Sequence, residues 1–251
     1  MNTQEALPLP IAQTEATPWL MLISRIALFA GFQVLLALLL FLAGTAEAWD
    51  AAANWWPLTV AAVDVVSLLL LIRVFAVEGK RFWDMFRIEH ATIKGDLLVL
   101  VLLIVLMGPV SYLPNVWLGQ ALFGDPEATL ALIVRPLPYW AVFLSILLFP
   151  IGQGLTELPT YFGYVMPRLP AQGMRRWLAV SLPALMLALQ HIAIPLLFDG
   201  RFMLWRALMF IPFAFLVGIT LHWRPRLMPY MVVVHTLMDM AFAVMLLNAA
   251  Y

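Results

Sequence analysis

Long apolar stretches separated by short polar segments form the main pattern along this chain. A helix needs about 20 mostly apolar residues to cross the hydrocarbon core of a bilayer. Stretches that meet or approach this length lie at 19–44, 56–77, 96–117, 140–166, 177–198, 203–221 and 228–247. Because lipid cannot pair open backbone groups, each stretch is expected to be a helix. The pattern predicts an all-α polytopic membrane protein with about seven transmembrane helices.

The composition agrees with this class and excludes several functions. Of 251 residues, 64% are hydrophobic and 11% are charged, whereas soluble domains are about half apolar and a quarter charged. The formal net charge is zero, so no basic surface indicates nucleic acid as a partner. Cysteine is absent, which excludes disulfides, thiolate metal sites and a cysteine nucleophile. Residues 1–17 are expected to be a disordered cytoplasmic tail, and 18–251 a single transmembrane domain whose motif-bearing core lies at about 140–247.

The basic residues predict how the chain is oriented. The segments 78–95, 167–176 and 222–227 carry four, three and two lysines or arginines. With Arg25 and Arg73 assigned to helix ends on the same side, 11 of the 14 basic residues gather there. Since cytoplasmic loops carry an excess of Lys and Arg, the N-terminus is predicted to be cytoplasmic and the C-terminus outside. The expected location is the plasma (inner) membrane.

Five ionisable groups fall inside the predicted spans: Asp64, Glu157, His191, His235 and Asp239. Such groups are costly in lipid and therefore indicate function. The last four lie 9 to 15 residues from the basic residue that ends their helix, which is about 14–22 Å at 1.5 Å per residue. We therefore expect them to meet near the middle of a bundle, with the i and i+4 pair on one helix face. Asp64 has no assigned partner other than Arg25 or Arg73.

Several kinds of site fit these groups. A carboxylate and an imidazole facing a wet cavity can deprotonate a water, and a second imidazole with a short acid can stabilise an oxyanion. The same four residues could instead ligate Zn²⁺ or another divalent ion, although the absence of HExxH excludes the usual zincin. A buried polar network that only fixes helix packing is the structural alternative. A transporter is less favoured, because the sequence lacks paired broken helices.

Three short motifs on three predicted helices carry a family resemblance. ELPTYFGY at 157–164 aligns with the form EExxWRGY, LALQH at 187–191 with FxxxH, and HTLMD at 235–239 with HxxxD. In this order and spacing, over about 100 residues from 150 to 247, the chain resembles the CPBP family of CAAX proteases, bacteriocin-processing enzymes and Abi-type immunity proteins. The resemblance implies a CPBP/Abi-like bundle and an intramembrane endopeptidase that acts on a membrane-embedded or lipidated peptide among membrane lipids.

The resemblance also implies roles for individual residues. Glu157 and His191 would activate water, while His235 and Asp239 would stabilise the oxyanion. The sequence leaves open whether a divalent metal such as zinc takes part in that chemistry. These implied roles match the chemistry that the residue types allow.

The first motif departs from the family pattern. Leu158 stands in place of the second glutamate and Phe162 in place of the arginine. Their joint absence removes a balanced ion pair, so Tyr161 or Thr160 becomes the candidate for a replacement hydrogen bond to the first glutamate. Pro159 lacks an N–H and predicts a local opening of this helix. The departures support an alternative function, namely a catalytically inactive scaffold, immunity factor or binding partner.

Overall fold

The computed structural model describes residues 16–250, with side chains described up to Met245. The predicted tail therefore lies almost wholly outside the described residues, and its last residue, Thr17, already begins α1. The long helices are α1 (Thr17–Leu42), α3 (Trp56–Val77), α4 (Ile93–Phe123), α6 (Tyr139–Leu158), α8 (Gly200–Trp223) and α9 (Met228–Ala250). Shorter elements are α2 (Ala48–Asn54), η1 (Phe82–Phe86), η2 (His90–Thr92), α5 (Ala128–Ile133), η3 (Pro159–Val165), η4 (Pro170–Gln172), α7 (Arg176–Gln190) and η5 (Pro225–Leu227).

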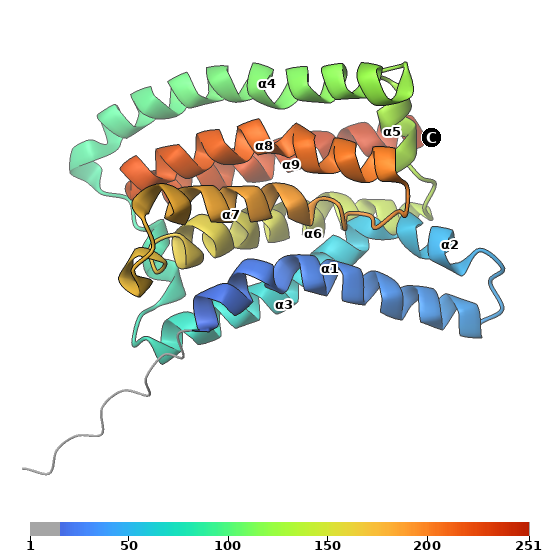
Figure 1. Ribbon diagram of the computed structural model, residues 1–251, viewed down its shortest axis with the longest axis horizontal. Helices are drawn as coiled ribbons and strands as arrows, with labels where there is room; N and C mark the ends of the chain where they lie inside the picture. The colour runs from blue at the N-terminus through green and yellow to red at the C-terminus, as the bar shows by residue number, and fades with distance from the viewer. Residues whose placement is uncertain (1–15, 251) are drawn as a thin grey trace, which may run out of the picture.

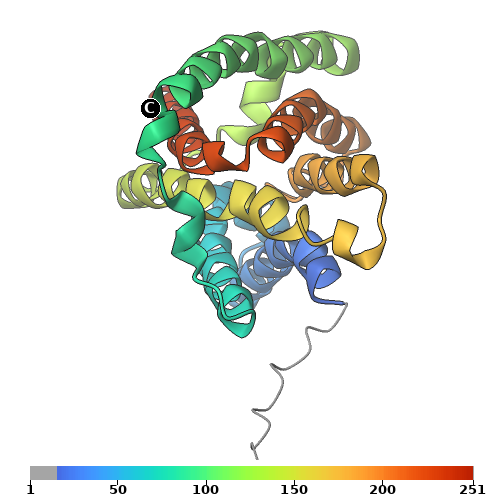
Figure 2. The ribbon, with the colours of Figure 1, turned by 90° about the vertical axis from the view of Figure 1, so that its left-hand side faces the viewer.

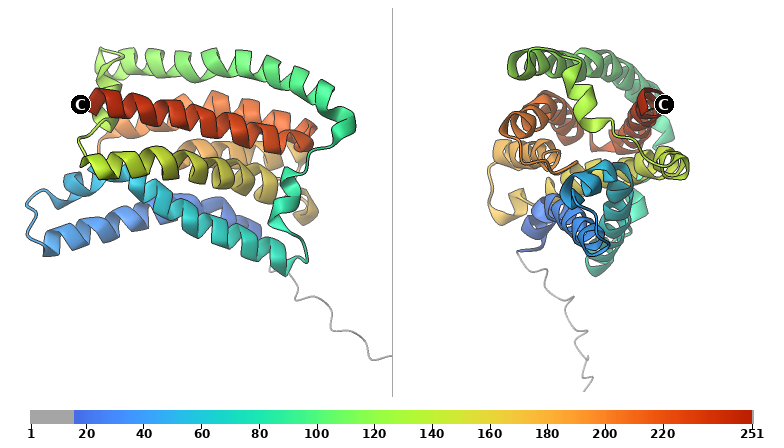
Figure 3. Two further views of the ribbon diagram at one scale, coloured as in Figure 1. Left: turned by 180° about the vertical axis from the view of Figure 1, so that it is seen from behind. Right: turned by 90° about the vertical axis from the view of Figure 1, so that its right-hand side faces the viewer.

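The long helices lie roughly side by side, with α4 along one edge and α1 and α3 along the other (Figures 1 and 3). Between them lie α6, α7, α8 and α9, and the most extensive contacts are those of α7 with α8, α6 with α9, and α3 with α6. Among the described residues, six helices are long and apolar enough to cross a membrane, and no strand is present. This confirms the predicted helical class and indicates an integral membrane protein.

The predicted stretch 177–198 is only partly helical. Its helix, α7, has 15 residues and ends at Gln190, so the prediction of a helix up to 198 was wrong beyond that point. Pro195 disfavours the α conformation of the residue before it and offers no N–H of its own. Residues 191–199 instead continue without helix beside α8 to the start of that helix (Figure 1). The count of seven spans therefore stays a prediction.

The non-helical residues that follow α7 are mostly buried, from His191 to Leu197. Their backbone groups are paired by side chains of other helices. Gln33 donates to the Leu196 carbonyl oxygen at 2.8 Å and accepts from the Leu196 N–H at 2.8 Å, and Trp49 Nε1 donates to the same carbonyl at 3.0 Å. Non-helical backbone at membrane depth requires such partners inside the protein.

The three basic segments lie at the same end of the bundle, onto which Figure 2 looks. Arg168 forms an ion pair with Glu78 at the end of α3. Arg226 Nε lies 2.8 Å from Asp96 Oδ1 near the start of α4. This grouping agrees with the pattern from which the orientation was predicted, while the sidedness itself stays a prediction.

Candidate active site in a cavity between the helices

Glu157 lies in the last turn of α6, where the helix changes its geometry. Pro159, two residues after Glu157, has no backbone N–H to donate to the preceding turn. From there to Val165 the chain continues as a π-helix, and such segments are frequent at functional sites. The local opening predicted from Pro159 thus takes the form of a wider helical turn directly after the acid.

The four predicted site residues are brought together from α6, the end of α7, and α9. His191 Nε2 lies 3.6 Å from Glu157 Oε1, and His235 Nε2 lies 3.1 Å from Glu157 Oε2. His235 Nε2 also lies 3.3 Å from Asp239 Oδ2. Glu157 is 1% exposed, so it is neither in a loop nor in contact with lipid. The predicted convergence is confirmed, and the catalytic role stays a prediction.

The two imidazoles are held differently. His191 Nδ1 lies 2.9 Å from the Leu187 carbonyl oxygen, one helical turn back, and its ring stacks on Phe210 with centroids 3.6 Å apart. In a neutral ring this contact places the proton on Nδ1 and leaves the Nε2 lone pair facing Glu157. His235 Nδ1, by contrast, has no hydrogen-bond partner among the described residues. His191 is therefore anchored through Nδ1, whereas His235 is held through its Nε2 contacts with Glu157 and Asp239.

Gln190 is a site residue that sequence reasoning missed. Its side-chain Nε2 donates to Glu157 Oε1, and its Oε1 accepts from Arg25 Nε at 3.0 Å and from the Tyr161 hydroxyl at 3.1 Å. The hydrogen bond to Glu157 expected from Tyr161 is therefore not formed, because the Tyr161 hydroxyl donates to Gln190 and Gln190 donates to Glu157. The Thr160 hydroxyl makes no hydrogen bond with a described residue. The sequence offered one indication of this role, because Gln190 is a polar residue in an apolar helix and directly precedes His191 of the second motif.

The structure also corrects the predicted position of Arg25. It was assigned to a helix end, but it lies inside the bundle with no exposed surface. Its Nη2 lies 2.9 Å from Asp64 Oδ1, its Nη1 lies 2.7 Å from Thr156 Oγ1, and it also donates to Gln153 Oε1. The open question about Asp64 is therefore answered, because its partner is Arg25. The ion pair continues through Gln190 to Glu157.

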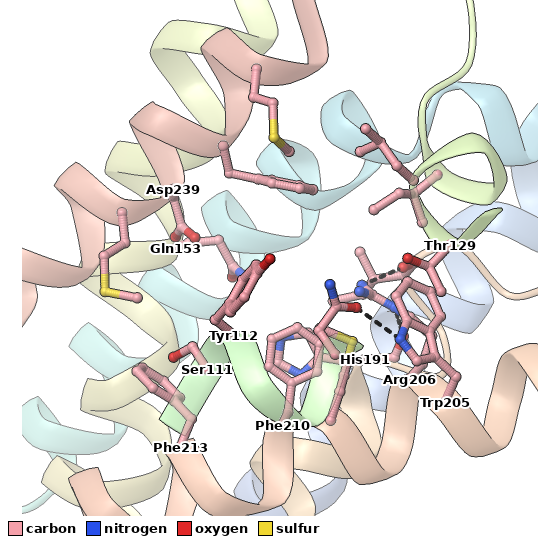
Figure 4. Close-up of a pocket in the computed structure, with 18 of the residues that line it drawn as sticks. Ser111, Tyr112, Thr129, Gln153, His191, Trp205, Arg206, Phe210, Phe213 and Asp239 are labelled. Atoms are coloured by element: carbon pink, nitrogen blue, oxygen red, sulfur yellow. Dashed lines mark hydrogen bonds between the residues drawn. The ribbon is translucent and has the colours of Figure 1, made fainter. Parts of the chain in front are cut away.

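The site opens into a cavity of about 640 Å³, whose wall includes Glu157, His191, His235 and Asp239. This is within the range of pockets that hold small ligands or peptide segments, about 300–1,000 Å³. Most of the remaining wall is apolar or aromatic and comes from α4, α5, α6, α8 and α9. Figure 4 shows Asp239 and Gln153 on one side of the cavity and Arg206 on the other, with His191 between them.

Metal binding was left open by the sequence. Over residues 16–245, whose side chains are described, no group of three or more His, Cys, Asp or Glu side chains is arranged to hold a metal ion. Glu157 contacts both imidazoles directly. The divalent ion therefore stays a prediction, and no chemical step below passes through one.

Comparisons of the chain with protein-family models, curated proteins and solved structures gave no match. The CPBP resemblance therefore depends on the three motifs alone. Two of these motifs supply residues that contact the glutamate of the first, through His191 and His235.

Proposed function

We propose that the protein is an intramembrane endopeptidase that hydrolyses a peptide bond with a water activated by Glu157 and His191. The observation that carries the proposal is the contact of one buried carboxylate with two imidazoles on the wall of a largely apolar cavity. Buried ionisable groups at this depth are costly unless paired and commonly mark function. Their arrangement fits hydrolysis without a covalent intermediate.

Glu157 and His191 suit the role of general base. His191 is anchored through Nδ1 on the Leu187 carbonyl oxygen, so its Nε2 and Glu157 Oε1 both present lone pairs at a separation of 3.6 Å. A water beside both atoms can donate a hydrogen bond to each and transfer one proton to Glu157 as it attacks the peptide carbonyl. The proton then passes to the leaving amine.

His235 suits the role of oxyanion donor. Its Nε2 lies between the carboxylates of Glu157 and Asp239, which favours the tautomer that carries the proton on Nε2. Nδ1 forms no hydrogen bond with the described residues, so the ring is held through Nε2, whose N–H a substrate oxygen beside the two acids would share. Donors aimed at the developing negative charge are commonly the largest single contribution to such catalysis.

An apolar cavity at this depth suits a membrane-embedded or lipidated peptide. Its wall carries several aromatic and aliphatic side chains, among them Trp56, Met107, Phe149, Phe210 and Phe213. Apolar contacts of this kind bind a peptide that already resides in lipid, while the few polar groups fix its orientation.

A second candidate function is a catalytically inactive membrane scaffold, immunity factor or binding partner. The observation that favours it is that both Glu157 oxygens already have partners, namely Gln190, His191 and His235. A fully paired buried network is also what a purely structural role requires. Catalysis is preferred because the network borders a cavity, which a packing role does not need.

The test compares cells that carry the wild-type protein, Glu157→Gln or the exposed control His222→Ala. Membrane polypeptides are separated by length and identified by mass spectrometry. We expect a polypeptide that is shortened with the wild type and the control but not with Glu157→Gln, at equal amounts of folded protein. The purified protein should then cleave that polypeptide, and a parallel reaction with a chelator tests the divalent ion. Full cellular function of the double variant Glu157→Ala/His191→Ala would overturn the proposal.

A further inference from the structure

A second hollow of the molecule is an open groove at the basic end of the bundle, between the start of α1 and the start of α7. The start of α1 lies beside the segment that leads into α7 (Figure 2). The groove has a volume of about 670 Å³ and is lined by Ala16, Trp19, residues 172–175 and Leu178. It shares no lining residue with the cavity that contains Glu157, and the proposed reaction gives it no role.

Two adjacent arginines give this groove a positive charge. Arg175 lines the groove, and Arg176 follows it as the first residue of α7. Both residues are exposed, and within the described part of the chain neither lies in ion-pair distance of an Asp or Glu. The neighbouring Arg168, by contrast, is paired with Glu78. The two guanidiniums are therefore available to an anion from outside the protein.

Two tryptophans place the groove at the level of the lipid headgroups. Trp19 is the third residue of α1 and Trp177 the second of α7, and both are exposed. Trp19 Nε1 donates to Gln172 Oε1 at 2.8 Å, which holds the indole against the groove. Exposed tryptophans at helix ends are typical of the membrane–water interface, where an apolar ring and a polar N–H both find suitable surroundings. The groove thus lies where the phosphates of one leaflet are found.

An apolar surface continues from the groove along each of the two helices, which contact each other. Ile23 lies one turn after Trp19 on α1, and Leu185 lies two turns after Leu178 on α7. All four side chains are exposed, and residues at these spacings share a helix face. An acyl chain can therefore lie along α1 and α7 while the headgroup that carries it stays beside Arg175.

We propose that this groove binds one anionic phospholipid, with its phosphate on Arg175 and Arg176 and an acyl chain against Trp19 and Leu178. A guanidinium donates two parallel N–H groups to phosphate oxygens. A zwitterionic lipid would place its ammonium group beside the same two cations, and no Asp or Glu is among the residues that line the groove. Charge complementarity therefore selects a lipid of net negative charge. This inference is independent of the proposed reaction.

The experiment uses a reporter placed on the proposed path of the acyl chain. The chain has no cysteine, so Ile23→Cys can carry a single nitrobenzoxadiazole fluorophore. Val233→Cys, at an exposed position near the same end of α9, reports the surrounding lipid. Each protein is placed in phosphatidylcholine nanodiscs that contain a small fraction of lipid with a nitroxide on its acyl chain, which quenches the fluorophore. The nitroxide is carried either by phosphatidylglycerol or by an equal fraction of phosphatidylcholine.

We expect labelled phosphatidylglycerol to quench the reporter at Ile23→Cys at least about fivefold more than labelled phosphatidylcholine. The two lipids should quench the reporter at Val233→Cys alike. Equal quenching by the two lipids at Ile23→Cys overturns the inference without any change to the arginines. So does the same preference at Val233→Cys, because the anionic lipid would then gather around the whole bundle.

Two double variants of the reporter protein separate the groove from the general charge of this end. Arg175→Gln/Arg176→Gln should abolish the preference for phosphatidylglycerol at Ile23→Cys. Arg81→Gln/Lys94→Gln is the matched control and should preserve it, because these residues are also exposed at the basic end and, among the described residues, also lack an acidic partner. An equal loss of preference in both double variants overturns the inference, since the lipid would then respond to net charge and not to the groove.

Discussion

Arg25 of α1 and Asp64 of α3 form an ion pair of 2.9 Å in the interior of the bundle. The same guanidinium donates to Gln190, whose amide donates to Glu157. A structural ion pair and the proposed catalytic acid therefore belong to one hydrogen-bonded network that ties α1, α3, α6 and α7 together. Substitutions at Arg25 and Asp64 therefore test packing, and substitutions at Gln190 test how Glu157 is held for catalysis.

The ion pair itself gives the first prediction. Asp64→Leu alone leaves Arg25 as an unpaired buried charge and should lower the free energy of unfolding by about 3–5 kcal/mol. Arg25→Met/Asp64→Leu should lower it by less than the sum of the two single variants, because neither charge is then left alone. Stability is measured by denaturant titration in detergent micelles. The exposed pair Asp84 and Arg87, with atoms 2.9 Å apart, is the control, and its removal should change little. Additive losses at Arg25 and Asp64 would contradict this account.

Gln190 gives the second prediction, which separates positioning from packing. Gln190→Leu leaves Arg25, Tyr161 and Glu157 short of a partner, at about 1–3 kcal/mol for each buried group left unpaired. Gln190→Glu keeps an acceptor for Arg25 and Tyr161 but places a second carboxyl group against Glu157, and two buried carboxyls in contact share one proton. We expect both variants to be less stable than the wild type, and Gln190→Glu to lose at least about tenfold in cleavage rate, because the shared proton stops Glu157 from acting as a base. The exposed Gln120→Leu is the control. Wild-type cleavage by Gln190→Glu would show that the amide has no part in positioning the acid.

The sequence predicted the helices best where a long apolar run has proline only in its first turn, as at Pro57 of α3 and Pro229 of α9. The predicted 56–77 coincides with α3, and 228–247 falls within α9. The prediction failed in 177–198, where the helix ends at Gln190 and Pro195 disfavours helix in the residues that follow. Apolar residues indicate burial, but they do not distinguish helix from an irregular segment whose backbone is paired by Gln33, Trp49 and Arg206.

The candidate site could be predicted from depth and spacing only in part. Glu157, His191, His235 and Asp239 were found because their distances from basic helix ends agreed. The assumption that basic residues mark helix ends misassigned Arg25. This arginine lies eight residues after the start of α1, and only its partners on other helices show that it is buried. Gln190 was missed although it stands beside the motif histidine, because its role depends on contacts with Arg25, Tyr161 and Glu157. Arg206 was missed because its acceptors, the carbonyl oxygens of His191 and Ile194, lie in another segment.

The contact between Glu78 and Arg168 gives a prediction about pH. Burial raises the pKa of Glu78, but its hydrogen bonds with Arg168 and the charge of that guanidinium outweigh this and leave the pKa below its ordinary value of 4.5. A carboxyl whose pKa is lower in the folded state stabilises the fold above its unfolded pKa, and the effect is lost as pH falls through the folded pKa. The pair should therefore stabilise the protein at neutral pH and cease to do so only below about pH 4.

The measurement compares wild type, Glu78→Gln and the exposed control Glu89→Gln across this pH range. Glu78→Gln should be less stable than the wild type by about 1–3 kcal/mol at pH 7, and the difference should narrow toward pH 2. Glu89→Gln should follow the wild type throughout. A constant difference between wild type and Glu78→Gln at all pH values would mean that the charge of Glu78 is not what stabilises this end of the bundle.

The close approach of α6 and α9 gives the last prediction. Gly154 lies one turn before Glu157, and a Cβ there would overlap the Thr236 hydroxyl oxygen and lie 3.1 Å from the Val232 carbonyl oxygen. Gly154→Ala should therefore push the two helices apart and move Glu157 away from His235, lowering the cleavage rate more than the stability. Gly154→Ala/Thr236→Ala removes the overlapping oxygen and should recover part of the rate. Gly31→Ala, where a Cβ meets no atom within 4 Å, is the control and should be as stable as the wild type or more stable by up to about 1 kcal/mol. Undiminished cleavage by Gly154→Ala would mean that the 3.1 Å contact between His235 and Glu157 is not needed for the reaction.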